Sequence, residues 1–240
     1  MRAWHFSENA YPYLPPAESY PSIRVSLPNC IYDPEKGAAL YDRFIEEWLI
    51  AEDEGVEIML NEHHQPATCV DPAAPLMLAA LARLSNKARL LILGNPIANR
   101  RQPVRVAEEM AMIDVLSRGR LEAANPPGYL PVAMNVQLAR GAHNVVSAYG
   151  TKQSTVEGAI EAGTLFAGTP DQVFQQIKNH WKYVGGYGHL LIMGQAGFLE
   201  HDDTVHGIRM FAREVYPRLK QFSPDSVPSG TFEQSTAAAH

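Results

Sequence analysis

Three ionisable side chains follow one apolar run of the sequence. The run at 56–61 leads directly into Glu62, His63 and His64. A histidine changes its protonation near neutral pH, so it can donate or accept a proton during a reaction. The alternative is a hydrogen-bonded pair of histidines at a rim of the fold. A metal site is disfavoured, because adjacent strand residues point to opposite faces and no His-x-x-x-His or Cys-x-x-Cys motif is present.

A second group of candidates follows the next apolar run, at 88–95. Gly94 and Asn95 end that run before Pro96, where the choice lies between a ligand contact and an ordinary turn. The arginines at 100–101 fit a solvated loop better than an anion clamp. A Rossmann-type site is only weakly indicated, since the Gly-Gly-Tyr-Gly-His stretch at 185–189 lacks the full G-x-G-x-x-G pattern.

The elements that must position these residues alternate in type. Asp71 is a candidate N-cap with Pro72 at the first helical position, and Thr169 is another N-cap before Pro170. Continuous apolar strands between amphipathic helices indicate a parallel sheet covered by helices. The pattern predicts buried strands at 2–6, 56–61, 88–95 and 188–194, and helices at 37–55, 71–85, 102–119, 170–184 and 202–222.

Three segments depart from this alternation. Residues 7–36 form a long loop rich in Pro, Ser, Asn and Tyr, a length that usually serves a function, here that of a lid over an organic substrate. Residues 123–163 read as an irregular insertion or junction. Residues 223–240 contain few core-forming side chains and are expected to be a disordered tail. A single domain at 1–222 fits, with units one to three at 1–122 and the last units at 164–222.

Composition limits the function classes. The chain has 240 residues, 46% of them hydrophobic, and a formal net charge of −6. An acidic chain without clustered Lys and Arg is not expected to bind nucleic acid. The sequence holds no run of 18 apolar residues for a membrane span and no apolar leader near its first residue. Cys30 and Cys69 are expected to be free thiols, which favours a cytoplasmic location.

One combination of motifs resembles the bacterial luciferase-like flavin-dependent monooxygenases. A strand ends in Glu62-His63-His64, and the next ends near Gly94-Asn95-Pro96. The phrase Pro-Val-Arg…Glu-Glu…Asp…Leu-Ser-Arg-Gly-Arg at 103–120 is the most specific match. The resemblance covers 1–122 and resumes more weakly over 164–222.

The resemblance implies an α/β fold of the (β/α)8 TIM-barrel type, reduced FMN and O2 as reactants, and a small organic substrate. His63 matches the histidine that assists the reaction of reduced flavin with O2. Glu62 and His64 match its neighbours, and Gly94 and Asn95 match the strand end that lies against the flavin ring. A flavin reductase or NAD(P)H would supply reduced FMN. A shortened, non-catalytic flavin-binding homologue is the alternative, and a hydrolase is disfavoured because no G-x-S-x-G occurs.

The sequence departs from the family after Glu122, where it runs directly into Ala-Ala-Asn-Pro-Pro. Full-length relatives continue through strands four to seven, and one of those strand ends supplies an arginine for the flavin phosphate. We therefore expect an incomplete barrel without a recognisable phosphate site. The first three units and the last should still form a contiguous sheet, because strand eight adjoins strand one in a closed barrel.

A homodimer is also expected. The family is typically dimeric through the helices after strands two and three. In this chain the corresponding segments, 75–84 and 104–116, are apolar on most sides, and such helices are normally buried. In the second segment Val106, Met110, Met112 and Ile113 are expected to lie outside the core face.

Overall fold

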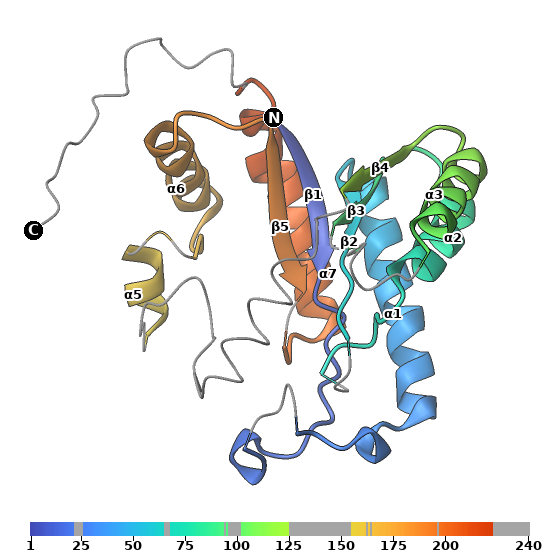
Figure 1. Cartoon of the computed structure of the whole chain (residues 1–240). Coiled ribbons are helices and arrows are strands. Elements are labelled where there is room, and N and C mark those ends of the chain that lie inside the picture. The colour runs from blue at the N-terminus through green and yellow to red at the C-terminus, as the bar shows by residue number, and fades with distance from the viewer. Residues whose placement is uncertain are drawn as a thin grey trace, which may run out of the picture.

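A computed structural model shows a five-stranded parallel sheet flanked by helices (Figure 1). The strand order is β4-β3-β2-β1-β5, and every neighbouring pair is parallel. The strands are β1 (Arg2–Ser7), β2 (Glu57–Leu60), β3 (Leu90–Leu93), β4 (Leu121–Ala124) and β5 (His189–Gln195). The structure describes residues 1–21, 26–64, 68–93, 95, 102–124, 155–161, 163, 165–195 and 197–222.

The order of the strands confirms two predictions. The fold is α/β, with apolar strands parallel to one another, as the alternating pattern indicated. The last strand, β5, pairs with β1, with Trp4 in register with Leu191 and Phe6 with Met193. The first units and the last unit of a barrel therefore form a contiguous sheet in this chain.

The helices begin close to where the sequence predicts. Asp33 caps α1 by accepting from the backbone of Glu35 and Lys36, and Thr169 forms a full capping box with Gln172. The bounds are η1 (Ala17–Ser19), η2 (Asn29–Ile31), α1 (Pro34–Asp53), α2 (Ala74–Leu84), α3 (Pro103–Ser117), α5 (Val156–Glu161), α6 (Pro170–Tyr183), α7 (His201–Met210), η4 (Phe211–Val215) and α8 (Tyr216–Leu219).

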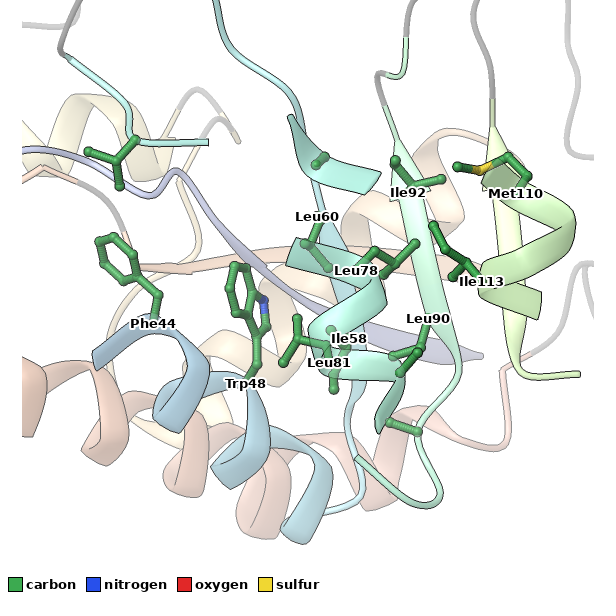
Figure 2. Close-up of a cluster of buried hydrophobic side chains, with 14 of the residues drawn as sticks. Phe44, Trp48, Ile58, Leu60, Leu78, Leu81, Leu90, Ile92, Met110 and Ile113 are labelled. Atoms are coloured by element: carbon green, nitrogen blue, oxygen red, sulfur yellow. The ribbon is translucent and has the colours of Figure 1, made fainter. Parts of the chain in front are cut away.

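The core lies between the sheet and the helices and has two parts. In the first, Trp48 of α1 and Leu81 of α2 pack on Ile58 and Leu90 of the sheet, and Ile113 of α3 closes the cluster (Figure 2). All five side chains are at most 3% exposed. The second cluster joins β1 and β5 to α6, η4 and α8; it contains Ala3, Phe174, Ile177, Val215 and Leu219. Both clusters lie on the face of the sheet that is opposite to the side chains of Trp4 and Phe6.

Two local predictions about α2 and β5 are wrong. Asp71 does not cap α2, which begins at Ala74 after Ala73, without a side-chain cap; the Asp71 carboxylate turns inward to Asn9 instead. The strand β5 is not buried on both faces, since Leu191 is 41% and Met193 54% exposed. It is an edge strand of the described sheet.

The last helix is interrupted rather than continuous. Residues 201–219 form α7, a π-helical stretch η4 and α8 in succession. Pro217 lacks a backbone N–H and so cannot continue the ladder of hydrogen bonds to the preceding turn, which accounts for a widened turn just before it. A short helix, α5, also lies within the region that the sequence predicts to be irregular.

The apolar faces of α3 differ from the prediction. Val106, Met110 and Ile113 are buried against α2 and the sheet, so they form the core face rather than a second apolar face. Met112 is exposed as predicted, at 65%, together with Val115 at 78%. A helix with this many apolar residues thus uses only part of them in its own core.

Several predictions concern residues outside the described part of the chain: the strand end at Gly94, the arginines at 100–101, most of the junction at 123–163, and the tail at 223–240. Among the helices of the described residues, none is both long enough and apolar enough to cross a membrane.

Candidate active site at the carboxyl ends of the strands

The candidate site lies where β1 and β2 end at the same edge of the sheet. Parallel strands place their carboxyl ends together, and catalytic groups in such folds are found there. Glu8 and Asn9 follow β1, and His63 lies just beyond β2. The backbone N–H of His63 donates to the carbonyl oxygen of Asp71 at 3.0 Å, which fixes the segment after β2 against the segment before α2.

His63 is surrounded by polar groups from both strand ends. Its Nε2 contacts the side-chain amide of Asn61 and lies 3.4 Å from Oε2 of Glu8. The imidazole is partly exposed, at 36%, and so can reach a ligand. The Sγ of Cys69 lies 3.9 Å from the same Glu8 oxygen. His63 therefore has a carboxylate, an amide and a thiol within reach.

His64 has a different partner. Its Nε2 lies 2.7 Å from Oε1 of Glu62, whose side chain is fully buried, while His64 itself is 38% exposed. The two histidines therefore have different carboxylate partners, Glu8 for His63 and Glu62 for His64. The structure places Glu62 and His64 together as a pair beside His63.

Asp71, whose carbonyl accepts from His63, is also hydrogen-bonded to Asn9. The Nδ2 of Asn9 donates to Oδ2 of Asp71 at 3.2 Å, and the Asn9 carbonyl accepts from the backbone of Val70 at 2.9 Å. Burial raises the pKa of Asp71 to about 7, and the negative charge of Glu62 adds to the rise. Asp71 is thus a buried acid that can be neutral near neutral pH, which the sequence suggested only as a helix cap.

Sequence reasoning missed Glu8 and gave little weight to Cys69. An isolated antiparallel bridge between Ala10 and Cys69 brings the two chain segments together. Such a contact joins residues about sixty positions apart and leaves no periodic pattern in the sequence. Only the position of Glu8, next to the end of a predicted strand, could have marked it.

The predicted flavin contact after β3 is partly described. Asn95 is completely buried at the end of that strand, while Gly94 lies outside the described residues. Two other side-chain amides at this edge, those of Asn9 and Asn61, each have an oxygen without a hydrogen-bond donor among the described residues. Both oxygens, Oδ1 in each case, are buried. Buried polar atoms are nearly always hydrogen-bonded, so these oxygens favour a ligand with N–H or O–H groups.

An apolar surface adjoins the polar edge. Leu191 and Met193 point away from the face on which Ile192 and Gly194 line a cavity with His5. Leu191 pairs in register with Trp4 of β1, and Met193 pairs with Phe6. The edge thus combines hydrogen-bonding groups with an apolar wall, which suits a flat heterocyclic ligand.

A parallel sheet in barrel order, with helices packed on it and a polar site at the carboxyl ends, defines a protein of the (β/α)-barrel type, and the described residues form part of such a barrel. Comparison with known proteins specifies the class further. Residues 25–124 match the sequence model of the luciferase-like monooxygenases. This stretch is less than half of the chain, and it carries the Glu-His-His and helix motifs that resemble this family.

Individual relatives agree with this match. The chain is 30% identical over 162 residues to the oxygenase component of the flavin-dependent trigonelline monooxygenase of Acinetobacter baylyi strain ADP1. The match covers 66% of this chain but 38% of that relative, so the chain spans well under half of the relative's length.

Two solved structures share the fold. Monooxygenase RslO1 from Streptomyces bottropensis has a TM-score of 0.60 at 14% identity, with 91% of this chain and 99% of that chain covered. The oxygenating constituent of 3,6-diketocamphane monooxygenase from Pseudomonas putida, in complex with FMN, has a TM-score of 0.56 at 10% identity, covering 75% and 94%. These likenesses confirm the luciferase-like barrel fold.

Proposed function

We propose that the chain is a flavin-dependent monooxygenase that uses reduced FMN and O2 on a small organic substrate. The observation that carries the proposal is His63, held at the carboxyl edge of the sheet between Glu8 and Asn61. It lies within the stretch that matches the luciferase-like monooxygenases. The curated relative is flavin-dependent, and one structural neighbour is a complex with FMN.

The residues present fit such a cofactor. The flavin ring carries N–H groups and a broad apolar face. Among the described residues, the edge offers the unsatisfied oxygens of Asn9 and Asn61, and β5 offers the exposed Met193. Asn61 and Asn95 would hold the polar side of the ring, while the predicted contact at Gly94 lies outside the described residues. Reduced flavin, when bound, supplies the electrons that activate O2.

The protein's own part in this chemistry is to position groups and to hold a proton. His63 would hold a proton at Nε2, where Glu8 forms an ion pair with the protonated ring. The carbonyl of Asp71 fixes the backbone of His63, and the contact of His64 with the buried Glu62 carboxylate fixes the adjacent part of the segment. These contacts orient the imidazole before the reactants arrive.

The proposal includes partners. Because the curated relative is an oxygenase component, a separate flavin reductase, or NAD(P)H, is the expected source of reduced FMN. A homodimer is expected as well, since Leu76 of α2 and Val104, Met112 and Val115 of α3 are 65–78% exposed. Two cysteine thiols agree with a cytoplasmic location.

Replacement of His63 tests the proposed function. Oxygen consumption and substrate oxidation with chemically reduced FMN should fall by about a hundredfold or more in His63→Ala, within the range that general acid–base groups contribute. A matched control is His206→Ala on α7, where the side chain is exposed and distant in sequence from the site. Both variants should unfold at nearly the same urea concentration as the parent protein.

The outcome separates the two readings of the family resemblance. Wild-type rates in His63→Ala would contradict the role of this histidine. FMN binding without turnover in the parent protein would instead identify a non-catalytic flavin-binding homologue. A fluorescence titration with FMN, run beside the activity assay, distinguishes the two results.

The dimer is tested separately. Val115→Glu places a charge on the exposed face of α3 without touching the core, where Ile113 is buried. If α3 contributes to a two-fold interface, the parent chain should scatter light as a dimer and the variant as a monomer. A monomeric parent chain at micromolar concentration would contradict the homodimer.

A further inference from the structure

Three side chains of metal-binding type meet at the candidate site. Glu8, His63 and Cys69 each place a potential ligand atom within 4.8 Å of the others. They come from the end of β1, the end of β2 and the segment before α2, which the bridge at Ala10 holds together. Among the residues that the structure describes, these three are the His, Cys and acidic side chains close enough together to bind one ion.

The spacing fits a tetrahedral cation. Zn2+ bonds of roughly 2.0–2.3 Å to nitrogen, oxygen and sulfur set neighbouring ligand atoms roughly 3.3–3.6 Å apart. The measured separation is 3.4 Å between His63 Nε2 and Glu8 Oε2, and 3.9 Å between Cys69 Sγ and that same oxygen. All three ligand atoms lie within 4.8 Å of one another, so side-chain rotations that move them by about 1 Å or less would complete the coordination geometry.

The surroundings support a bound ion with an attached water. Asn61 is 8% exposed and its amide contacts His63, while its Oδ1 is a buried acceptor without a donor among the described residues. A water in the fourth position of Zn2+ carries acidic O–H groups that such an oxygen would accept. The set of one sulfur, one nitrogen and one carboxylate oxygen favours Zn2+ or a similar thiophilic ion over Mg2+ or Ca2+.

We propose that Glu8, His63 and Cys69 bind a thiophilic divalent cation of the Zn2+ type, and that this ion inhibits the proposed reaction. Binding uses the lone pair of His63 Nε2, so the imidazole can no longer hold or move a proton there. The thiol of Cys69 releases its proton when it binds the ion, so affinity rises with pH. The binding itself does not depend on flavin, although the inhibition rests on the proposed function.

Titration of the flavin-free full chain with Co2+ tests the binding. A thiolate ligand gives a charge-transfer band in the near ultraviolet, and a tetrahedral site gives strong visible bands; both should saturate at one ion per chain and disappear when Zn2+ is added. Cys69→Ser should abolish the charge-transfer band. Glu8→Gln should weaken Co2+ binding by about tenfold or more, the loss that follows when even a supporting partner of a ligand is removed.

The matched control is Cys30→Ser. Cys30 is the exposed thiol on η2, away from the cluster, and its replacement should leave both bands unchanged. Circular dichroism of each variant verifies that it is folded. Loss of the band in Cys30→Ser but not in Cys69→Ser, or equal Co2+ affinity in the parent and both cluster variants, would overturn the proposal. Because the spectra need neither flavin nor turnover, the metal site can hold or fail independently of the monooxygenase activity.

Inhibition is measured in a second assay. Zn2+ should lower the rate of the parent protein, and EDTA should restore it. Cys69→Ser should need at least about ten times more Zn2+ for the same inhibition, in line with its weaker binding. Equal sensitivity of the two proteins to Zn2+ would show that the inhibition arises elsewhere.

Discussion

His5 should make the protein lose stability as the solution becomes mildly acidic. The side chain is 2% exposed on β1, and burial lowers its pKa from 6.5 to about 4. Its Nε2 has no partner among the described residues, and its ring lies against Gly194, Val56 and Ile208. These neighbours offer no charge or acceptor to compensate an imidazolium, so the folded protein favours the neutral ring.

The size of the effect follows from the two pKa values. A neutral His5 contributes stability that is present above the unfolded pKa of 6.5 and is lost as the pH falls towards about 4. The full difference is about 3 kcal/mol, because one pKa unit corresponds to about 1.4 kcal/mol. Between about pH 7 and pH 5 the loss from this group alone is about 2 kcal/mol.

His5→Phe removes the titration and keeps a ring in the apolar surroundings. Urea unfolding followed by tryptophan fluorescence at both pH values gives the free energy of unfolding of each protein. The variant is expected to lose about 2 kcal/mol less than the parent between the two conditions, whatever its stability at pH 7. His206→Ala, an exposed control, should behave like the parent. An equal loss in His5→Phe and the parent would refute the reasoning.

Two further predictions concern Asp71 and Thr169. Asp71→Asn should show the opposite trend to His5→Phe. The pKa of Asp71 is raised to about 7, so the neutral acid stabilises the fold; this contribution is complete below the unfolded pKa and is lost as the pH rises through 7. From about pH 5 to pH 8 the variant should therefore gain about 3 kcal/mol relative to the parent in the same urea assay. A constant difference between the two proteins would contradict an Asp71 that titrates near neutrality. Thr169→Ala breaks the capping box of α6 and should lower the free energy of unfolding by about 1 kcal/mol, which thermal or urea unfolding measures; no change would mean that water replaces the cap.

The sequence by itself determined the alternation of elements. The apolar runs at 56–61 and 88–95 indicated strands because they are short and lie between helical segments, and the helix at 102–119 followed from a periodicity of about 3.6 residues. The N-cap at Thr169 was predictable for the same reason, and the structure adds its capping-box partner Gln172, three residues further on. The adjacent strand ends at Glu62–His64 and Asn95 located the edge of the sheet where chemistry is expected.

The tertiary structure decided which side chains meet at that edge. Glu8 and Cys69 reach His63 through a bridge between distant segments, and Asp71 leaves the helix end to face Asn9. It also decided which apolar faces are buried: Ile113 joins the core while Leu191 remains exposed. Which side chains meet and which apolar faces are buried depends on how the elements pack against one another. No local sequence pattern contains this information. Local periodicity therefore fixes where elements form, whereas long-range packing fixes the chemistry that they bring together.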